Sequence, residues 1–119
     1  MSCPQLRPTM YKAPILTGLA ITPQIVRDEL LVCFESANRE FSRLMAQPVT
    51  DDALKGQVRM FVESVFEKCG ASFTDPTKWG IITAIGECKT NAERMMGPQG
   101  ADIIKHHYEE MMKLVNRLD

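Results

Sequence analysis

The clearest structural signal in this 119-residue chain is the stretch from residue 22 to residue 46, TPQIVRDELLVCFESANREFSRLMA. Thr22 can cap a helix, and Pro23 fits the first helical turn, where its missing N–H costs nothing. Apolar residues then recur every three or four positions on one face: Val26, Leu30, Cys33, Phe34, Ala37, Phe41, Leu44 and Met45. This spacing predicts an amphipathic helix that runs to about Ala46 and buries that face.

Similar signals predict three further helices. Thr50 precedes two aspartates and caps a helix that runs to Cys69. The sequence Thr74-Asp75-Pro76 repeats the cap-then-proline signal and opens a third helix, which extends to Met96 and is ended by Gly97-Pro98. The last helix covers about 99–118. Their apolar stripes are expected to be buried, and they include Leu54, Val58, Phe61, Val62, Val65 and Phe66, then Ile81, Ile82, Ile85, Cys88, Ala92, Met95 and Met96, then Ile103, Ile104, Met111, Leu114, Val115 and Leu118.

Four such helices joined by short turns predict an all-α fold, an antiparallel four-helix bundle with an irregular N-terminal arm. Residues 1–22 form the extended arm, because Pro4, Pro8 and Pro14 push their neighbours toward extended geometry. Residues 23–119 form the helical bundle domain. A chain of this length buries enough surface for a single hydrophobic core.

Charge and composition exclude several classes of protein. Fourteen basic and fifteen acidic residues give a net charge of −1, so we expect no nucleic-acid partner. A helix-turn-helix regulator is disfavoured, since Lys78, Lys89 and Arg94 are spread around their helix. No segment approaches the roughly 20 apolar residues of a membrane span, and we find no secretory leader. We therefore expect a cytoplasmic protein that does not enter membranes.

No residue can be nominated for catalysis, and we expect no cofactor or metal. Glycine-rich nucleotide loops, GxSxG and HExxH are all absent. Neither histidine has a glutamate three positions earlier, so the pattern of di-iron bundles is missing. Cys33, Cys69 and Cys88 fall on apolar faces and are expected to be buried, reduced thiols. An enzymatic role is disfavoured but stays open.

The adjacent histidines point in different directions on a regular helix. His107 falls within the apolar arc, which predicts a core histidine satisfied by a hydrogen bond. The alternative is a small-ligand or metal-binding site between His107 and the core cysteines. His106 shares a stripe with Asp102 and Glu110, and we expect a solvated face there.

The back of the third predicted helix carries Trp79 and a strip of small residues, Gly80, Thr83, Gly86 and Thr90. Glycine inside a helix costs about 0.5–1 kcal/mol relative to alanine, which suggests that something packs closely there. The arm also carries apolar side chains that we expect to be buried, those of Ile15, Leu16 and Leu19. Either this chain's own arm lies across the strip, or a second chain does.

These observations predict a non-catalytic helical module for protein interaction or self-association. Its partner is a second copy of the chain or another protein. Trp79, Thr83, Gly86, Thr90, Ile15, Leu16 and Leu19 are the predicted partner-binding residues.

Overall fold

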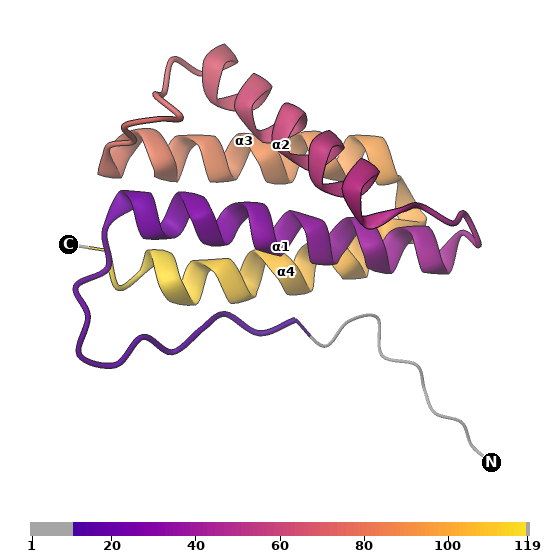
Figure 1. Cartoon of the computed structure of the whole chain (residues 1–119), viewed down its shortest axis with the longest axis horizontal. Coiled ribbons are helices and arrows are strands. Elements are labelled where there is room, and N and C mark those ends of the chain that lie inside the picture. The colour runs from indigo at the N-terminus through magenta and orange to yellow at the C-terminus, as the bar shows by residue number, and fades with distance from the viewer. Residues whose placement is uncertain (1–10, 119) are drawn as a thin grey trace.

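The computed structural model describes residues 11–118, which form four α-helices and one short 3-10 helix. The bounds are α1 Pro23–Leu44, α2 Asp51–Lys68, α3 Lys78–Met96, η1 Pro98–Gly100 and α4 Ala101–Val115. Figure 1 shows the α-helices packed together, with successive helices running in opposite directions. The prediction of an all-α four-helix bundle is confirmed. Residues 1–10, which include Cys3, lie outside the described residues.

The first two helices begin where their caps predict. The Thr22 hydroxyl accepts the Ile25 N–H at 3.2 Å, and the Thr50 hydroxyl accepts the Ala53 N–H at the same distance. Each bond satisfies one of the amide groups that the first turn of a helix leaves without an internal partner. Local sequence therefore sets both of these helix starts.

The start of α3 lies later in the chain than the Thr74-Asp75-Pro76 signal predicts. Its cap is Thr77, whose hydroxyl accepts the Gly80 N–H at 3.1 Å. The Ser72 hydroxyl instead accepts the Asp75 N–H at 3.0 Å, which holds this segment in a turn. Because Asp75 is bound into the turn, Thr74 does not cap the helix.

The connection between α3 and α4 is tight around Gly100. A Cβ atom at this position would lie 2.5 Å from the Cβ of Met96 and 3.1 Å from its sulfur. No side chain fits at that distance without a shift of the backbone. The glycine allows η1 to turn the chain directly from α3 into α4.

Gly100→Ala is therefore expected to lower the free energy of unfolding by about 1–3 kcal/mol. Gly86→Ala in α3 is the matched control, because its added Cβ would meet no atom within 4 Å. The control should stabilise the protein by about 0.4–1 kcal/mol through loss of unfolded-state freedom. Urea denaturation of both variants measures the difference, and equal stability of the two would contradict this account.

The core lies between α1, α3 and their neighbours. Helix α1 contacts α2, α3 and α4, and α3 also contacts α2 and α4. The largest fully buried side chains are Phe66, Leu30, Ile81, Met111, Leu114, Val26, Val62 and Cys88. All eight lie on the apolar faces of their helices, so helical periodicity predicts the centre of this core well.

Helix α2 does not run parallel to its neighbours. Figure 1 shows it running obliquely to the other three helices, on the side of α3 and α1. As a result the apolar stripe of α1 is covered only as far as Ala37, while Phe41 is half-buried and Leu44 is exposed. The prediction that this stripe stays buried as far as Met45 is therefore wrong, because a tilted helix cannot cover the whole length of α1.

Candidate functional site

The described part of the arm, residues 11–22, lies along α1 and α4. The Tyr11 hydroxyl donates to a Glu29 carboxylate oxygen on α1 at 2.5 Å. On α4, His106 Nε2 donates to the Tyr11 carbonyl at 2.8 Å, and Glu110 accepts the Ala13 N–H at 3.0 Å. These bonds fasten the start of the described arm to two helices at once.

The rest of the arm is held at the far end of α4. Arg117 donates to the Leu16 carbonyl at 2.9 Å, and Ile21 forms an isolated parallel bridge with Leu118. Leu16 is half-buried, but Ile15 and Leu19 remain exposed. Two of the three predicted partner-binding residues of the arm therefore face solvent in this chain.

His107 is buried, and both of its ring nitrogens form hydrogen bonds. Its Nδ1 lies 2.7 Å from the Ile103 carbonyl and must donate there, so Nε2 accepts from the Ser36 hydroxyl at 3.0 Å. The Tyr11 ring stacks on the imidazole, with 5.2 Å between ring centroids. Desolvation lowers the pKa of His107, which keeps the ring neutral. The prediction of a satisfied core histidine is confirmed.

The face around His106 is not the solvated surface that the sequence suggests. His106 is half-buried beneath the arm, and Glu110 is buried. Lys113 donates to Glu110 at 2.7 Å, and this hydrogen bond is the main cause of the lowered pKa of that carboxyl group. The expectation holds for Asp102, which is exposed, but it is wrong for His106 and Glu110, because the arm covers that part of α4.

Burial raises the pKa of the Glu29 carboxyl group, and the hydrogen bond from the Tyr11 hydroxyl opposes that rise. The same contact and its own burial raise the pKa of Tyr11. The pair is therefore suited to holding the arm, since Tyr11 keeps its proton as a hydrogen-bond donor.

The thiols are free among the described residues, but they differ in burial. Cys33 and Cys88 are buried as predicted, and burial raises the pKa of Cys88 to about 12. Cys69 is only half-buried, contrary to the prediction, because it is the C-cap of α2 and lies at the end of the helix. None of the buried thiols is activated as a nucleophile.

The region around His107 and the cysteines has little free space. A cavity lined by Cys33, His107, Met111 and their neighbours has a volume of about 20 Å³, which is near the minimum for one water molecule. Within residues 11–118, no three side chains of histidine, cysteine, aspartate or glutamate are placed to hold a metal ion.

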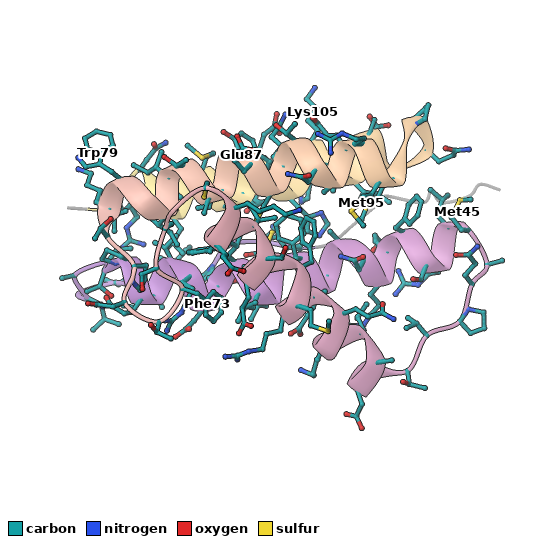
Figure 2. All side chains as sticks on the ribbon, turned by 90° about the horizontal axis from the view of Figure 1, so that it is seen from above. Met45, Phe73, Trp79, Glu87, Met95 and Lys105 are labelled. Atoms are coloured by element: carbon teal, nitrogen blue, oxygen red, sulfur yellow. The ribbon has the colours of Figure 1, made fainter. Side chains whose placement is uncertain are left out.

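The Trp79 strip is open to solvent in this chain. Trp79 is 74% exposed and stands on the outer side of α3 in Figure 2. Thr83 and Thr90 are also exposed, and nothing in the described chain approaches Gly86. Because the arm lies along α4, the alternative in which it covers this strip is wrong. Gly80 is different, since its added Cβ would lie 3.2 Å from Ala71 of the preceding loop.

The structure reveals a site that the sequence analysis missed, an apolar groove between α1, α2 and α3 with a volume of about 180 Å³. It is lined by Phe34, Asn38, Phe41, Gln57, Val58, Phe61, Ala92, Met95 and Met96. Figure 2 shows Met95 between α3 and the end of α1, where Met45 lies. Met95 is 72% exposed although the sequence predicts that it is buried.

The groove exists because α2 is tilted. Phe34 and Phe61 form its floor with ring centroids 5.6 Å apart, and Asn38 and Gln57 supply amide groups. None of its nine described lining residues carries a charge. The groove can therefore hold an apolar group, but its lining provides neither an acid, a base nor an anionic metal ligand.

The chain matches no protein-family model, no curated protein and no solved structure in the comparisons. Functional inference therefore rests on this geometry. None of the helices in the described part of the chain has the length and apolarity needed to cross a bilayer.

Proposed function

We propose that this protein is a non-catalytic helical module for protein interaction or self-association, and that the groove between α1, α2 and α3 is its docking surface. One observation carries the proposal. Three apolar residues on the predicted inward stripes of their helices, Phe41, Phe61 and Met95, are half-buried or exposed, and all three line the groove. An exposed cluster of apolar side chains is typical of a site at which a protein binds a partner.

The size of the groove favours a protein partner over a cofactor. Pockets for small molecules have volumes of about 300–1,000 Å³, whereas this groove has about 180 Å³. A space of this size suits one or two apolar side chains that anchor a partner helix. Methionine at the rim adapts its shape easily, because its side chain has three rotatable bonds.

The alternative of a small-ligand or metal-binding bundle is less well supported. It depends on His107, whose two ring nitrogens already bond to Ile103 and Ser36, and on a space of about 20 Å³. Trp79, with the strip on α3, remains a second proposed interaction surface, because it is a large exposed aromatic side chain that this chain leaves uncovered.

Selection of amphipathic helical peptides from a phage-displayed library tests the groove. Peptides bound by the full chain are expected to lose affinity at least about 10-fold against Met95→Lys, a loss of about 1.4 kcal/mol. Val32→Lys is the matched control, because Val32 is 49% exposed on α1 and does not line the groove. Selection of no peptide, or of peptides that bind Met95→Lys as well as the parent, would overturn the proposal.

A further inference from the structure

Between Ala53 and Ser64, one exposed side of helix α2 carries no charge. Ala53, Gln57, Met60 and Ser64 are all exposed and follow one another at intervals of four, three and four residues. This spacing places them on one side of the helix. Met60 is 73% exposed, although it is a large apolar residue. We call these four residues the α2 ridge.

The α2 ridge borders the groove. Gln57 belongs to both, and Phe61, one residue after Met60, is part of the groove lining. The tilt of α2 leaves the groove side of α1 and α3 without a covering helix (Figure 2). A second helix beside α2 would fill that space at the 8–10 Å separation of packed helices.

We propose that two copies of this chain associate through this face, so that the α2 ridge of each copy lies against the groove of the other and Met60 enters it. The inference rests on the proposed function, and it names the partner. A twofold dimer needs one surface that carries both the projecting side chain and its receiving groove. The neighbouring α2 ridge and groove meet that requirement within one chain.

The charges favour a second copy. The groove lining and the α2 ridge are both uncharged, so neither leaves a buried charge unpaired when they meet. Charged residues on the other side of α2 form ion pairs within the chain, Arg59 with Glu63 at 2.7 Å and Lys55 with Glu35 at 3.4 Å. With a net charge of −1, two copies repel each other little.

The α2 ridge and the groove can form the centre of a dimer interface. A standard interface uses about 20–30 residues on each side, with an apolar centre and a polar rim. Helix α2 has 18 residues and so extends about 27 Å along the face. The α2 ridge and the groove supply the uncharged centre of this face.

Sedimentation velocity of the full chain tests the proposal. The mass is expected to rise with concentration from 13.4 kDa toward twice that value. Met60→Lys should weaken the dimer at least about 10-fold, because it would bring a charge into an apolar groove. The Met95→Lys variant should have the same effect, whereas Val32→Lys should leave the association unchanged.

All three lysine positions are exposed in the single chain, so the variants are expected to fold, and urea denaturation verifies this. A mass that stays at 13.4 kDa at every concentration would overturn the dimer. So would equal association of the Met60→Lys and Val32→Lys variants. A monomeric chain that still binds library peptides through Met95 would reject the second copy as partner and leave the proposed function standing.

Discussion

Replacement of Phe66 by alanine is expected to lower the free energy of unfolding by about 3–5 kcal/mol. Phe66 is fully buried on α2, and its ring meets Phe73 edge to face with centroids 5.4 Å apart. The substitution therefore removes a large apolar side chain and an aromatic pair together. This is the largest effect that we expect from any single replacement described here.

Phe66→Ala should also weaken the packing of the loop that connects α2 and α3. Phe73 lies near two guanidinium groups, those of Arg27 at 5.4 Å and Arg59 at 5.2 Å from its ring centroid. Arg27 also donates to the carbonyl groups of Phe73 at 2.7 Å and Thr74 at 3.2 Å. Phe66 supports the ring around which these contacts are arranged.

Urea denaturation followed by far-ultraviolet circular dichroism measures the effect of Phe66→Ala. Phe61→Ala is the control, since Phe61 is also on α2 but is only half-buried beside the groove. Its expected cost is smaller, about 1–2 kcal/mol, because less of its surface leaves water on folding. If Phe66→Ala lowers the free energy of unfolding no more than Phe61→Ala does, Phe66 is not the buried residue of α2 described here.

Tyr11→Ala is expected to release the arm and to lower the free energy of unfolding by about 2–4 kcal/mol. The substitution removes the hydroxyl that bonds to Glu29 and the ring that stacks on His107. Without the ring, His107 is open to water and the Ala13 amide is no longer held against Glu110. Amide hydrogen exchange at Ala13 should therefore become fast.

Two further variants divide this effect into its parts. Tyr11→Phe keeps the ring and removes the hydroxyl, which bonds to Glu29 and also contacts the Met111 sulfur at 3.7 Å. This loss should cost about 1 kcal/mol, because the Glu29 carboxylate is partly solvated. Ile15→Ala alters an exposed residue of the same arm and should stay within about 0.5 kcal/mol of the parent. If Tyr11→Ala unfolds like the parent chain and Ala13 stays protected, Tyr11 does not hold the arm.

The helices and the centre of the core follow from local sequence. Thr22 and Thr50 cap their helices through bonds that span three residues, and any chain with those residues can make them. Likewise Leu30 and Ile81 lie on apolar stripes with helical spacing, so their burial follows from periodicity. The Thr74-Asp75-Pro76 signal did not predict the start of α3, because Ser72 binds the Asp75 N–H in a turn and Thr77 caps the helix.

The groove and the position of the arm required the tertiary structure. The tilt of α2 is the result of packing among side chains from three helices, and no pattern within α2 encodes that angle. The arm docks through pairs such as Ala13 and Glu110, which are 97 residues apart in sequence. Periodicity identifies which face of a helix avoids water, but only the packed chain decides what covers that face. Met95 and His106 illustrate this, because the predicted inward residue is exposed and the predicted outward one is covered.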